Sequence, residues 1–401
     1  MMGHVFLKFS GLNYEDKEVS HAISFSTTIE NYDPLYLIYQ NIIPGMKGLF
    51  SLQPYKTVKN YYTRNENRNL WVYQLSLNNY RKQLIYYHAW ELKGIKMKYY
   101  FTSYNCSTVM HDMLSLARPK IYNDQMMWIT PLSTVKSLYK YNLIKKAQLY
   151  PNKDWFMRME KDTHLNINKT YRLKNKIINI SKYKSPNKIP YQRQLSVGYI
   201  NLNQDKYLKL SFLPASHLLN DYNREYFGES ELKIAYLSIL VNDKNIELNN
   251  FTLYGMKSYI PYSSLTHDLS YQFELAVKKE YAQNKKYTNT LTIDGGVGTD
   301  ILVARDINIF ALLNGGVGYD KYDNIHLLFN PRIGMMIYEV FNMKSLFYYQ
   351  QYFINKKHVY NKYVFEHNMF INKHFTLYFK LEKIEKHNSF LNYEFGLKYL
   401  F

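Results

Sequence analysis

The single cysteine of the chain, Cys106, is the residue best suited by type and surroundings to covalent chemistry. It stands in the stretch YNCSTVMHD, and apolar residues at helical spacing follow it, so the sequence predicts that Cys106 begins a helix that Pro119 ends. The positive end of a helix dipole and the free backbone N–H groups of the first turn favour a thiolate over a thiol. Cys106 is therefore a candidate nucleophile, with an inert buried thiol as the alternative.

A thiol nucleophile needs an imidazole that takes its proton, and usually a third polar group that orients the imidazole. Among the 12 histidines, His4 is the strongest candidate, because it follows a glycine in the predicted strand GHVFLKF. His21 and Ser24 fall on the predicted neighbouring strand and could supply the third group, although they alternate onto opposite faces. His111 lies five residues beyond Cys106, which turns it onto another face of the helix, so we expect it at the surface.

The elements that would position these residues have mixed α and β character up to about Lys146. GHVFLKFSG and HAISFSTT predict a β-hairpin, and LWVYQLSL predicts a further strand. SLNNYRKQLIYYHAWELKG has a polar start, helical apolar spacing and a terminal glycine, so it predicts a helix. We therefore expect an α+β domain over residues 1–148, followed over residues 149–192 by a linker and surface excursion rich in Lys and Asn.

Residues 193–401 have a different pattern, in which segments alternate between polar and apolar residues. In the last segment, NSFLNYEFGLKYLF, aromatic and aliphatic residues share one face, polar residues and a glycine share the other, and only Leu400 departs from the pattern. About twelve segments of this kind predict an antiparallel β-barrel that crosses a bilayer, with both ends on one side. A soluble β-sandwich would have the same period, but the strand length and the aromatic density favour the barrel. The predicted strands begin near Gln194, Lys206, Glu231, Ile246, Leu269, Asn289, Asp306, Asn324, Met343, Val359, His374 and Ser389.

Two glycine motifs, DGGVG at 294–298 and NGGVG at 314–318, fall inside predicted strands. No helix follows either motif, so they indicate close barrel packing or a strand bend, and not a phosphate-binding loop.

The chain carries 51 Lys and Arg against 32 Asp and Glu, a formal charge of +19. This excess indicates either an anionic partner, such as a phospholipid surface, a cell-wall polymer or nucleic acid, or only a basic surface. No recognition fold or arginine-rich reading element accompanies the charge, so we expect no nucleic acid. One cysteine and scattered histidines make no zinc cluster, and we expect neither a metal nor another cofactor. The sequence has no apolar run of about 18 or more residues and begins without a secretory signal.

The order of motifs in the first part of the chain resembles the bacterial lipoprotein N-acyltransferase B periplasmic-domain family. From Gly3 to about Lys146 the motifs are GHVFLKF, SHAISFS, GLFSLQPY, ENRNLWVYQL, HAWELKG, YYFTSYNCSTVMHDML and ARPKIYN. Members of this family resemble circularly permuted NlpC-type papain-like enzymes, in which the histidine strand precedes the cysteine helix. The tyrosine-rich C-terminal half is similar to the barrel-like region that accompanies this domain in some members.

The resemblance makes Cys106 the nucleophile and His4 the general base, and we assign Asn105 and Ser107, which flank the thiol, to oxyanion stabilisation or positioning. The implied reaction passes through an acyl-cysteine, with a phospholipid as the acyl donor and the N-terminus of a lipoprotein as the acceptor. An NlpC-type peptidoglycan amidase or peptidase and a non-catalytic outer-membrane barrel are the alternatives. The implied location is the bacterial outer membrane, with the N-terminal domain in the periplasm.

Two features depart from the resemblance. Relatives carry an acidic residue after the arginine of the tryptophan motif and a glutamate shortly beyond it, whereas here Asn69 follows Arg68 and Val72 stands at the glutamate position. Relatives also carry a signal peptide and a longer segment before the Gly-His strand, so we expect the N-terminus of this chain to be shortened.

Overall fold

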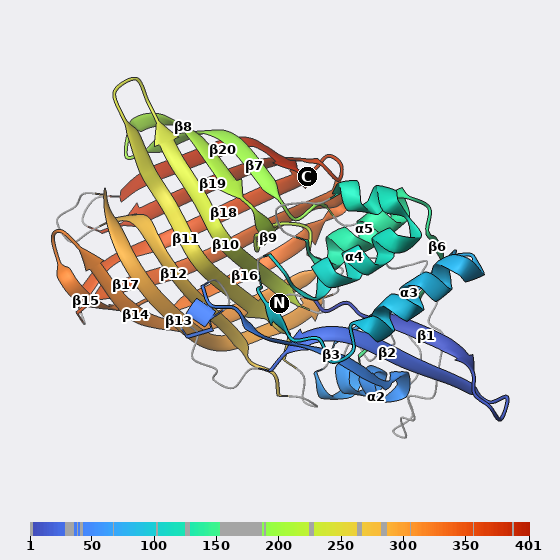
Figure 1. The fold of residues 1–401 in the computed structure, drawn as a ribbon. Coiled ribbons are helices and arrows are strands. Elements are labelled where there is room, and N and C mark those ends of the chain that lie inside the picture. Colours follow the sequence, from blue (N-terminus) through green and yellow to red (C-terminus); the bar gives the residue numbers. More distant parts are fainter. Residues whose placement is uncertain are drawn as a thin grey trace. The chain divides into compact units, whose positions relative to one another are not determined.

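The computed structural model describes the chain from Gly3 to Phe401, and its contacts divide the chain into two compact units, Met2–Asn187 and Lys188–Phe401 (Figure 1). Among the described residues, no helix is long and apolar enough to span a membrane. Most of the predicted linker at 149–192 falls outside the described residues. The residues left out are 29–35, 38, 41–42, 67, 102, 125–128, 153–186, 188–189, 224–227, 263–266, 282–286, 305, 356 and 387–388.

The N-terminal unit contains a four-stranded sheet in the order β1-β2-β3-β5. The strands β1 (Leu7–Leu12) and β2 (Glu18–Thr27) pair antiparallel around a short turn, which confirms the predicted hairpin. β3 (Met46–Pro54) pairs with β2, and β5 (Met97–Tyr99) pairs with β3. The predicted strand at LWVYQLSL is β4 (Leu70–Leu75), which pairs with β6 (Ile144–Tyr150) in a separate ribbon.

The helices of this unit lie between the strands in sequence. The predicted helix after β4 is α3 (Asn79–Glu91), and the predicted cysteine helix is α4 (Cys106–Ala117), so both predictions are confirmed. The remaining helical segments are α2 (Tyr55–Asn60), the π-helix η1 (Tyr61–Asn65), the 3-10 helix η2 (Pro119–Asp124) and α5 (Pro131–Lys140).

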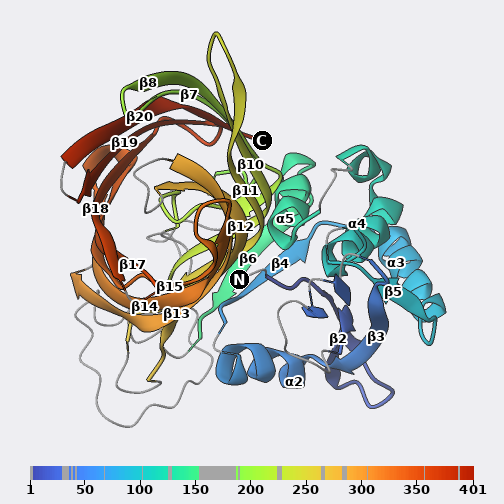
Figure 2. The same ribbon diagram turned by 90° about the vertical axis from the view of Figure 1, so that its left-hand side faces the viewer.

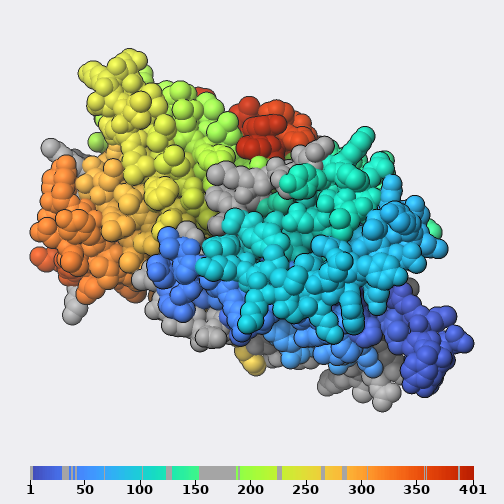
Figure 3. All heavy atoms as spheres, in the orientation of Figure 1, coloured from blue at the N-terminus to red at the C-terminus, as the bar shows by residue number. Residues whose placement is uncertain are grey.

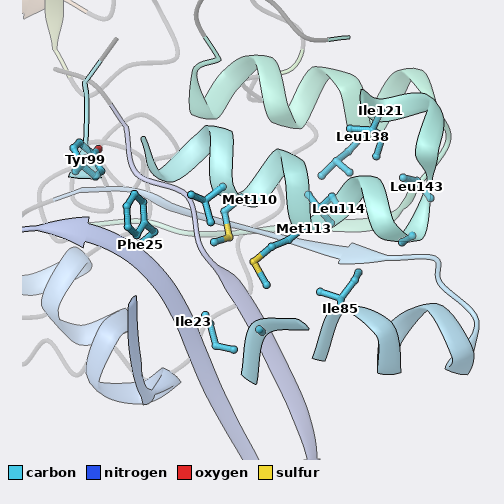
Figure 4. Close-up of a cluster of buried hydrophobic side chains, with 13 residues drawn as sticks. Ile23, Phe25, Ile85, Tyr99, Met110, Met113, Leu114, Ile121, Leu138 and Leu143 are labelled. Atoms are coloured by element: carbon cyan, nitrogen blue, oxygen red, sulfur yellow. The ribbon is translucent and has the colours of Figure 1, made fainter. Parts of the chain in front are cut away.

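The core of this unit forms where α4 packs on the sheet (Figure 4). Met110 and Met113 of α4 are fully buried, and they share a cluster with Ile23 and Phe25 of β2 and with Tyr99 of β5. Because burying a methionine or aromatic side chain of this kind contributes about 2 kcal/mol, this cluster fixes the position of α4 on the sheet. The start of α4, and hence Cys106, is positioned by the same packing.

The C-terminal unit is a closed antiparallel β-barrel of twelve strands (Figure 2). The ring closes because β20 pairs with β7, and β10 pairs with both β8 and β11. β15 and β16 are two halves of one crossing, since both pair with β14 and β17, and the three-residue β9 (Ala215–His217) lies beside β10. The crossings are β7 (Gln194–Leu202), β8 (Asp205–Leu213), β10 (Glu229–Val241), β11 (Ile246–Tyr259), β12 (Ser270–Tyr281), β13 (Tyr287–Ala304), β14 (Ile307–Asp320), β15 (Asn324–Phe329) with β16 (Arg332–Glu339), β17 (Met343–Ile354), β18 (Lys357–Phe370), β19 (Phe375–Glu385) and β20 (Ser389–Leu400).

The faces of the barrel follow the predicted alternation. Along β20, Leu391, Phe395 and Leu397 are exposed on the outer face, whereas Glu394 and Lys398 are buried inside. Strands that follow one another in sequence lie side by side, so the colours change in order across the barrel surface (Figure 3). A closed ring with an apolar exterior and a polar interior satisfies the backbone groups inside a bilayer, and this confirms the barrel prediction over the β-sandwich.

The two glycine motifs lie in β13 and β14 and face each other, with Gly295 opposite Gly315. A Cβ atom at Gly298 would lie 1.9 Å from the backbone oxygen of Ala311, and one at Gly316 would lie 2.3 Å from that of Ile293. The motifs therefore permit a close approach of two strands.

A segment between β9 and β10, residues 218–223, folds into the barrel lumen. The Lys344 ammonium group donates to the backbone oxygens of Leu219 (2.6 Å) and Asp221 (3.1 Å), and the Asn368 amide donates to that of Asn220 (2.6 Å). Lys344 and Asn368 are inward-facing residues of β17 and β18, so this inturned segment is held from inside the barrel.

Two predictions about histidines are wrong. β1 begins at Leu7 and not at Gly3, because the rings of His4 and Phe6 stack on Tyr62, at centroid distances of 5.8 and 5.9 Å, instead of continuing the ladder with β2. His111 is buried and not at the surface, because α3, α5 and β2 all pack against α4 and cover more than one of its faces.

Candidate active site

Asn105 fixes the start of the helix that carries the thiol. Its side-chain oxygen accepts hydrogen bonds from the backbone N–H groups of Ser107 (2.8 Å) and Thr108 (3.2 Å), which is an N-cap. Its amide nitrogen donates to the backbone oxygens of Phe101 (3.1 Å) and Ile129 (3.2 Å). Both polar atoms of the Asn105 side chain are therefore engaged within the protein, and this suits a positioning role.

Cys106 is the first residue of α4, and 4 % of its surface is exposed. Its sulfur lies 3.9 Å from the hydroxyl oxygen of Ser107. The Asn105 side chain accepts from the backbone N–H of Ser107, the second residue of the helix, and not from that of Cys106, the first residue. The Cys106 N–H group and the sulfur therefore lie together at the N-terminus of α4.

The Tyr99 hydroxyl group interacts with the side chain and the backbone of Cys106. Burial raises the pKa of Tyr99 above its usual range, and the neighbouring Cys106 sulfur raises it further. A neutral tyrosine hydroxyl group therefore lies near the Cys106 sulfur.

His4 stacks on a second tyrosine, Tyr62. Burial lowers the pKa of His4 from 6.5 to about 4, and the nearby Arg68 guanidinium adds to the decrease. The imidazole is therefore neutral at physiological pH, and its buried Nε2 has no hydrogen-bond partner among the described residues. A neutral imidazole with a free nitrogen is able to accept a proton, but its lowered pKa makes it a weaker base than an exposed histidine.

Tyr62 stacks on His4 and lies within electrostatic range of the Cys106 sulfur. Burial raises the pKa of Tyr62 to about 12. The Glu66 carboxylate raises this pKa by a smaller amount, and the Cys106 sulfur by less than Glu66. Cys106 and His4 thus both lie near Tyr62, but among the described residues no hydrogen bond joins the His4 ring to the Cys106 sulfur.

The two candidates for an orienting group have different environments. His21 is exposed at the surface of β2. Ser24 is partly buried, and its hydroxyl group hydrogen-bonds that of Ser51 on β3 at 2.7 Å. Ser24 lies on the same face of β2 as Ala22, which packs in the cluster that includes Tyr62.

Tyr99 and Tyr62 are site residues that sequence reasoning missed. The chain has 43 tyrosines, so a tyrosine seven residues before the cysteine carries no special signal. The sequence signal that could have pointed to Tyr99 is its place at the end of a short strand directly before the cysteine helix.

The fold defines the class of the protein: an integral outer-membrane β-barrel protein that carries a separate α+β domain. A family profile described as "Lnb N-terminal periplasmic domain" matches residues 1–141, and one described as "Domain of unknown function (DUF7840)" matches residues 185–400. The second match covers more than half of the 401 residues, so the chain belongs to the DUF7840 family, with an Lnb periplasmic domain in front of it. The barrel lies in the outer membrane and the N-terminal domain lies in the periplasm.

No curated protein is a significant match to the chain. Similar solved structures include the NanC porin (10 % identity, 52 % of this chain and 100 % of that chain, TM-score 0.34) and the KdgM porin (8 % identity, 52 % and 99 %, TM-score 0.34). The outer membrane channel DcaP of Acinetobacter baumannii is similar over 49 % of this chain and 63 % of its own, at 12 % identity and a TM-score of 0.24. The assignment of a barrel rests on the strand pairing itself.

Proposed function

We propose that the N-terminal domain is a thiol-dependent acyltransferase that acylates the N-terminus of lipoproteins, with a phospholipid as the acyl donor. The observation that supports this most is the placement of the lone thiol at the start of α4, with the Tyr99 hydroxyl group near its sulfur. The match of residues 1–141 to the Lnb periplasmic domain supports the same reaction class. The periplasmic location provides access to both substrates at the membrane surface.

The first half of the proposed reaction forms an acyl-enzyme. His4 takes the proton of the Cys106 thiol on Nε2, and the thiolate attacks an ester carbonyl of the phospholipid. The backbone N–H of Cys106 and the Tyr99 hydroxyl group donate to the oxyanion. The ester C–O bond then breaks, the proton on His4 passes to the leaving lysophospholipid, and a thioester remains on Cys106.

The second half transfers the acyl group to an amine. The α-amino nitrogen of the lipoprotein's N-terminal cysteine attacks the thioester, and His4 accepts the proton that this nitrogen loses. The C–S bond breaks, the sulfur leaves as a thiolate and the proton on His4 returns to it. Ser24 is the proposed orienting residue, because it shares a face of β2 with the cluster around Tyr62, whereas His21 is exposed. Asn105 and Ser107 are proposed as positioning residues at the start of α4.

The proposal is tested in cells that lack their own lipoprotein N-acyltransferase, with mass spectrometry of lipoprotein N-terminal peptides as the measurement. We expect the wild-type chain, expressed with a secretion signal, to restore N-acylation and Cys106→Ala to abolish it. Tyr99→Phe should lower the rate by about a hundredfold, because it removes one oxyanion donor. Ser115→Ala is the matched control, since it removes a hydroxyl group from the same helix, where among the described residues that group bonds only the backbone oxygen of Asp112, and leaves both donors in place.

Muropeptide profiles of the same strains separate the alternative reactions. Altered muropeptides with unchanged lipoproteins would assign the thiol to a peptidoglycan amidase or peptidase. If neither lipoproteins nor muropeptides depended on Cys106, the protein would be a non-catalytic barrel with an appended domain.

A further inference from the structure

The outer face of β16–β19 carries a groove of about 480 Å³ with a polar cluster at one end. Its apolar walls come from Met335, Ile337, Phe347, Phe365 and Phe379. This volume falls within the ~300–1,000 Å³ that small-molecule sites occupy. The groove therefore has the size and the lining of a site for an apolar ligand.

The groove faces the lipid and not the lumen. On β17, Lys344 and Leu346 are buried and point inward, while Phe347, which alternates with them, is half exposed and points outward. On β18, Asn368 bonds the inturned segment inside the lumen, so His367 points outward. A surface of this kind on a membrane barrel is covered by lipid.

The polar cluster consists of Glu339, Ser345 and His367. The Ser345 hydroxyl group donates to Oε1 of Glu339, and its oxygen lies 2.8 Å from Nδ1 of His367. The same carboxylate oxygen lies 3.7 Å from that nitrogen. Among the described residues, Oε2 of Glu339 has no hydrogen-bond or ion-pair partner, and the carboxylate is about one third exposed.

This arrangement suits binding better than nucleophilic catalysis. In a catalytic triad the carboxylate holds one imidazole nitrogen while the serine meets the other. Here Glu339 and Ser345 both lie at Nδ1 of His367, so no relay runs from the carboxylate through the ring to the serine.

The cluster lies at the membrane edge where the chain enters the barrel. Ile337, Ser345, His367 and Phe379 are register partners in one row across four strands. This row is two residues inside the start of β17, whereas Phe347 and Phe365 lie in the next row, deeper in the membrane. β7 begins at the same edge, because Gln194 pairs with Leu400 at the end of β20, so the cluster lies at the periplasmic leaflet.

We infer that this groove is a binding site for a phospholipid with an ammonium headgroup from the periplasmic leaflet. The acyl chain lies along Phe347 and Phe365, and the ammonium group donates to the free oxygen of Glu339. A carboxylate at the edge of a membrane is costly unless a cation pairs with it, and the headgroup supplies that cation. The site belongs to the barrel and does not depend on the chemistry of Cys106.

The test measures lipid that remains bound to the purified full-length chain, by native mass spectrometry with synthetic phosphatidylethanolamine and phosphatidylglycerol of identical acyl chains. We expect the wild type to prefer phosphatidylethanolamine and to bind it whether or not the thiol is present. Glu339→Gln should weaken this binding by about tenfold, because a charge-assisted hydrogen bond is lost. Cys106→Ala should bind as the wild type does, which separates this result from the proposed acyltransferase activity.

A second pair of variants tests the apolar part of the groove. Ile337→Trp fills the groove and should abolish retention, whereas Ile333→Trp, on the same outward face of β16 but outside the groove, should leave it unchanged. Equal retention of the two lipids by the wild type, or retention by both Glu339→Gln and Ile337→Trp at the wild-type level, would overturn the inference. Release of fatty acid by the Cys106→Ala chain would also overturn it, because the groove would then hydrolyse lipid and not only bind it.

Discussion

At the scale of single residues, burial determines the protonation state of His4. The imidazole is neutral at physiological pH, because burial and the Arg68 charge disfavour the imidazolium form, and its Nε2 is free of protein partners within the described residues. The same burial has a consequence for folding. In the unfolded chain this histidine titrates at its ordinary pKa of 6.5, whereas in the folded domain it titrates at a pKa of about 4.

We therefore expect the stability of the N-terminal domain to fall as the pH decreases from about 6.5 to about 4, because the unfolded state binds more protons over that range. His4→Gln should flatten this dependence, and the exposed His21→Gln should retain it. All four tryptophans of the sequence precede the barrel, so tryptophan fluorescence during urea unfolding reports on this domain alone. An unchanged pH slope in His4→Gln would show that the imidazole is not held neutral by the fold.

The residues of the site differ in how far the sequence could identify them. Cys106 is the only cysteine and stands before an amphipathic stretch, so its place at a helix start could be predicted from local pattern. His4 could be selected from the sequence as a candidate, but its conformation could not, because stacking on Tyr62 draws it away from the predicted strand. Tyr99 offers one sequence signal, its place before the cysteine helix, but its proximity to Cys106 could not be predicted, since that depends on packing through space.

At the scale of elements, the cap of α4 does more than begin a helix. The Asn105 side chain both accepts from the first turn and ties it to the backbone of Phe101 and Ile129. The cap of α5 is a matched comparison, because Thr130 accepts from the N–H of Ser133 at 3.1 Å in the same kind of capping box.

Asn105→Ala should destabilise the N-terminal domain by about 2–4 kcal/mol, because it removes a cap and leaves buried carbonyl groups without a donor. Thr130→Ala removes a cap alone, and should destabilise the N-terminal domain by about 1 kcal/mol. Urea unfolding followed by tryptophan fluorescence compares the two. Equal losses in both variants would contradict the view that Asn105 anchors α4 to its surroundings.

The barrel strands could be predicted closely, because the residues of a membrane strand face lipid and lumen in turn. Apolar and polar residues therefore alternate along the sequence. The predicted starts at Ile246, Asn324, Met343 and Ser389 coincide with those of β11, β15, β17 and β20. The inturned segment at 218–223 could not be predicted, because it has no strand period and is held by side chains far away in sequence. The burial of His111 has a similar cause, since it depends on how separate elements pack around α4.

At the scale of the whole molecule, charged side chains bridge the barrel lumen. Lys344 on β17 pairs with Glu229 on β10 at 2.6 Å, and these strands lie on opposite sides of the ring. The same ammonium group holds the inturned segment, and Lys398 on β20 pairs with Asp221 of that segment at 3.1 Å. Side chains and the inturned segment thus occupy the periplasmic end of the lumen.

We expect the wild-type protein to show no steady open-channel current in planar lipid bilayers, because this bridge crosses the path that ions would take. Lys344→Met alone should destabilise the barrel by about 3–5 kcal/mol, since Glu229 is then buried without a partner. The double variant Lys344→Met with Glu229→Gln removes both charges and the main anchor of the inturned segment. We expect it to fold and to show channel openings.

The ion pair between Lys279 and Glu247 provides the control, because it joins the neighbouring strands β12 and β11 and does not cross the lumen. The double variant Lys279→Met with Glu247→Gln should show no channel openings in the same bilayers. A wild-type protein that conducts like an open porin, or a control that opens as readily as the Lys344 variant, would show that the bridge does not close the barrel. In that case the lumen, and not the thiol domain alone, would have to be included in any account of what this protein does.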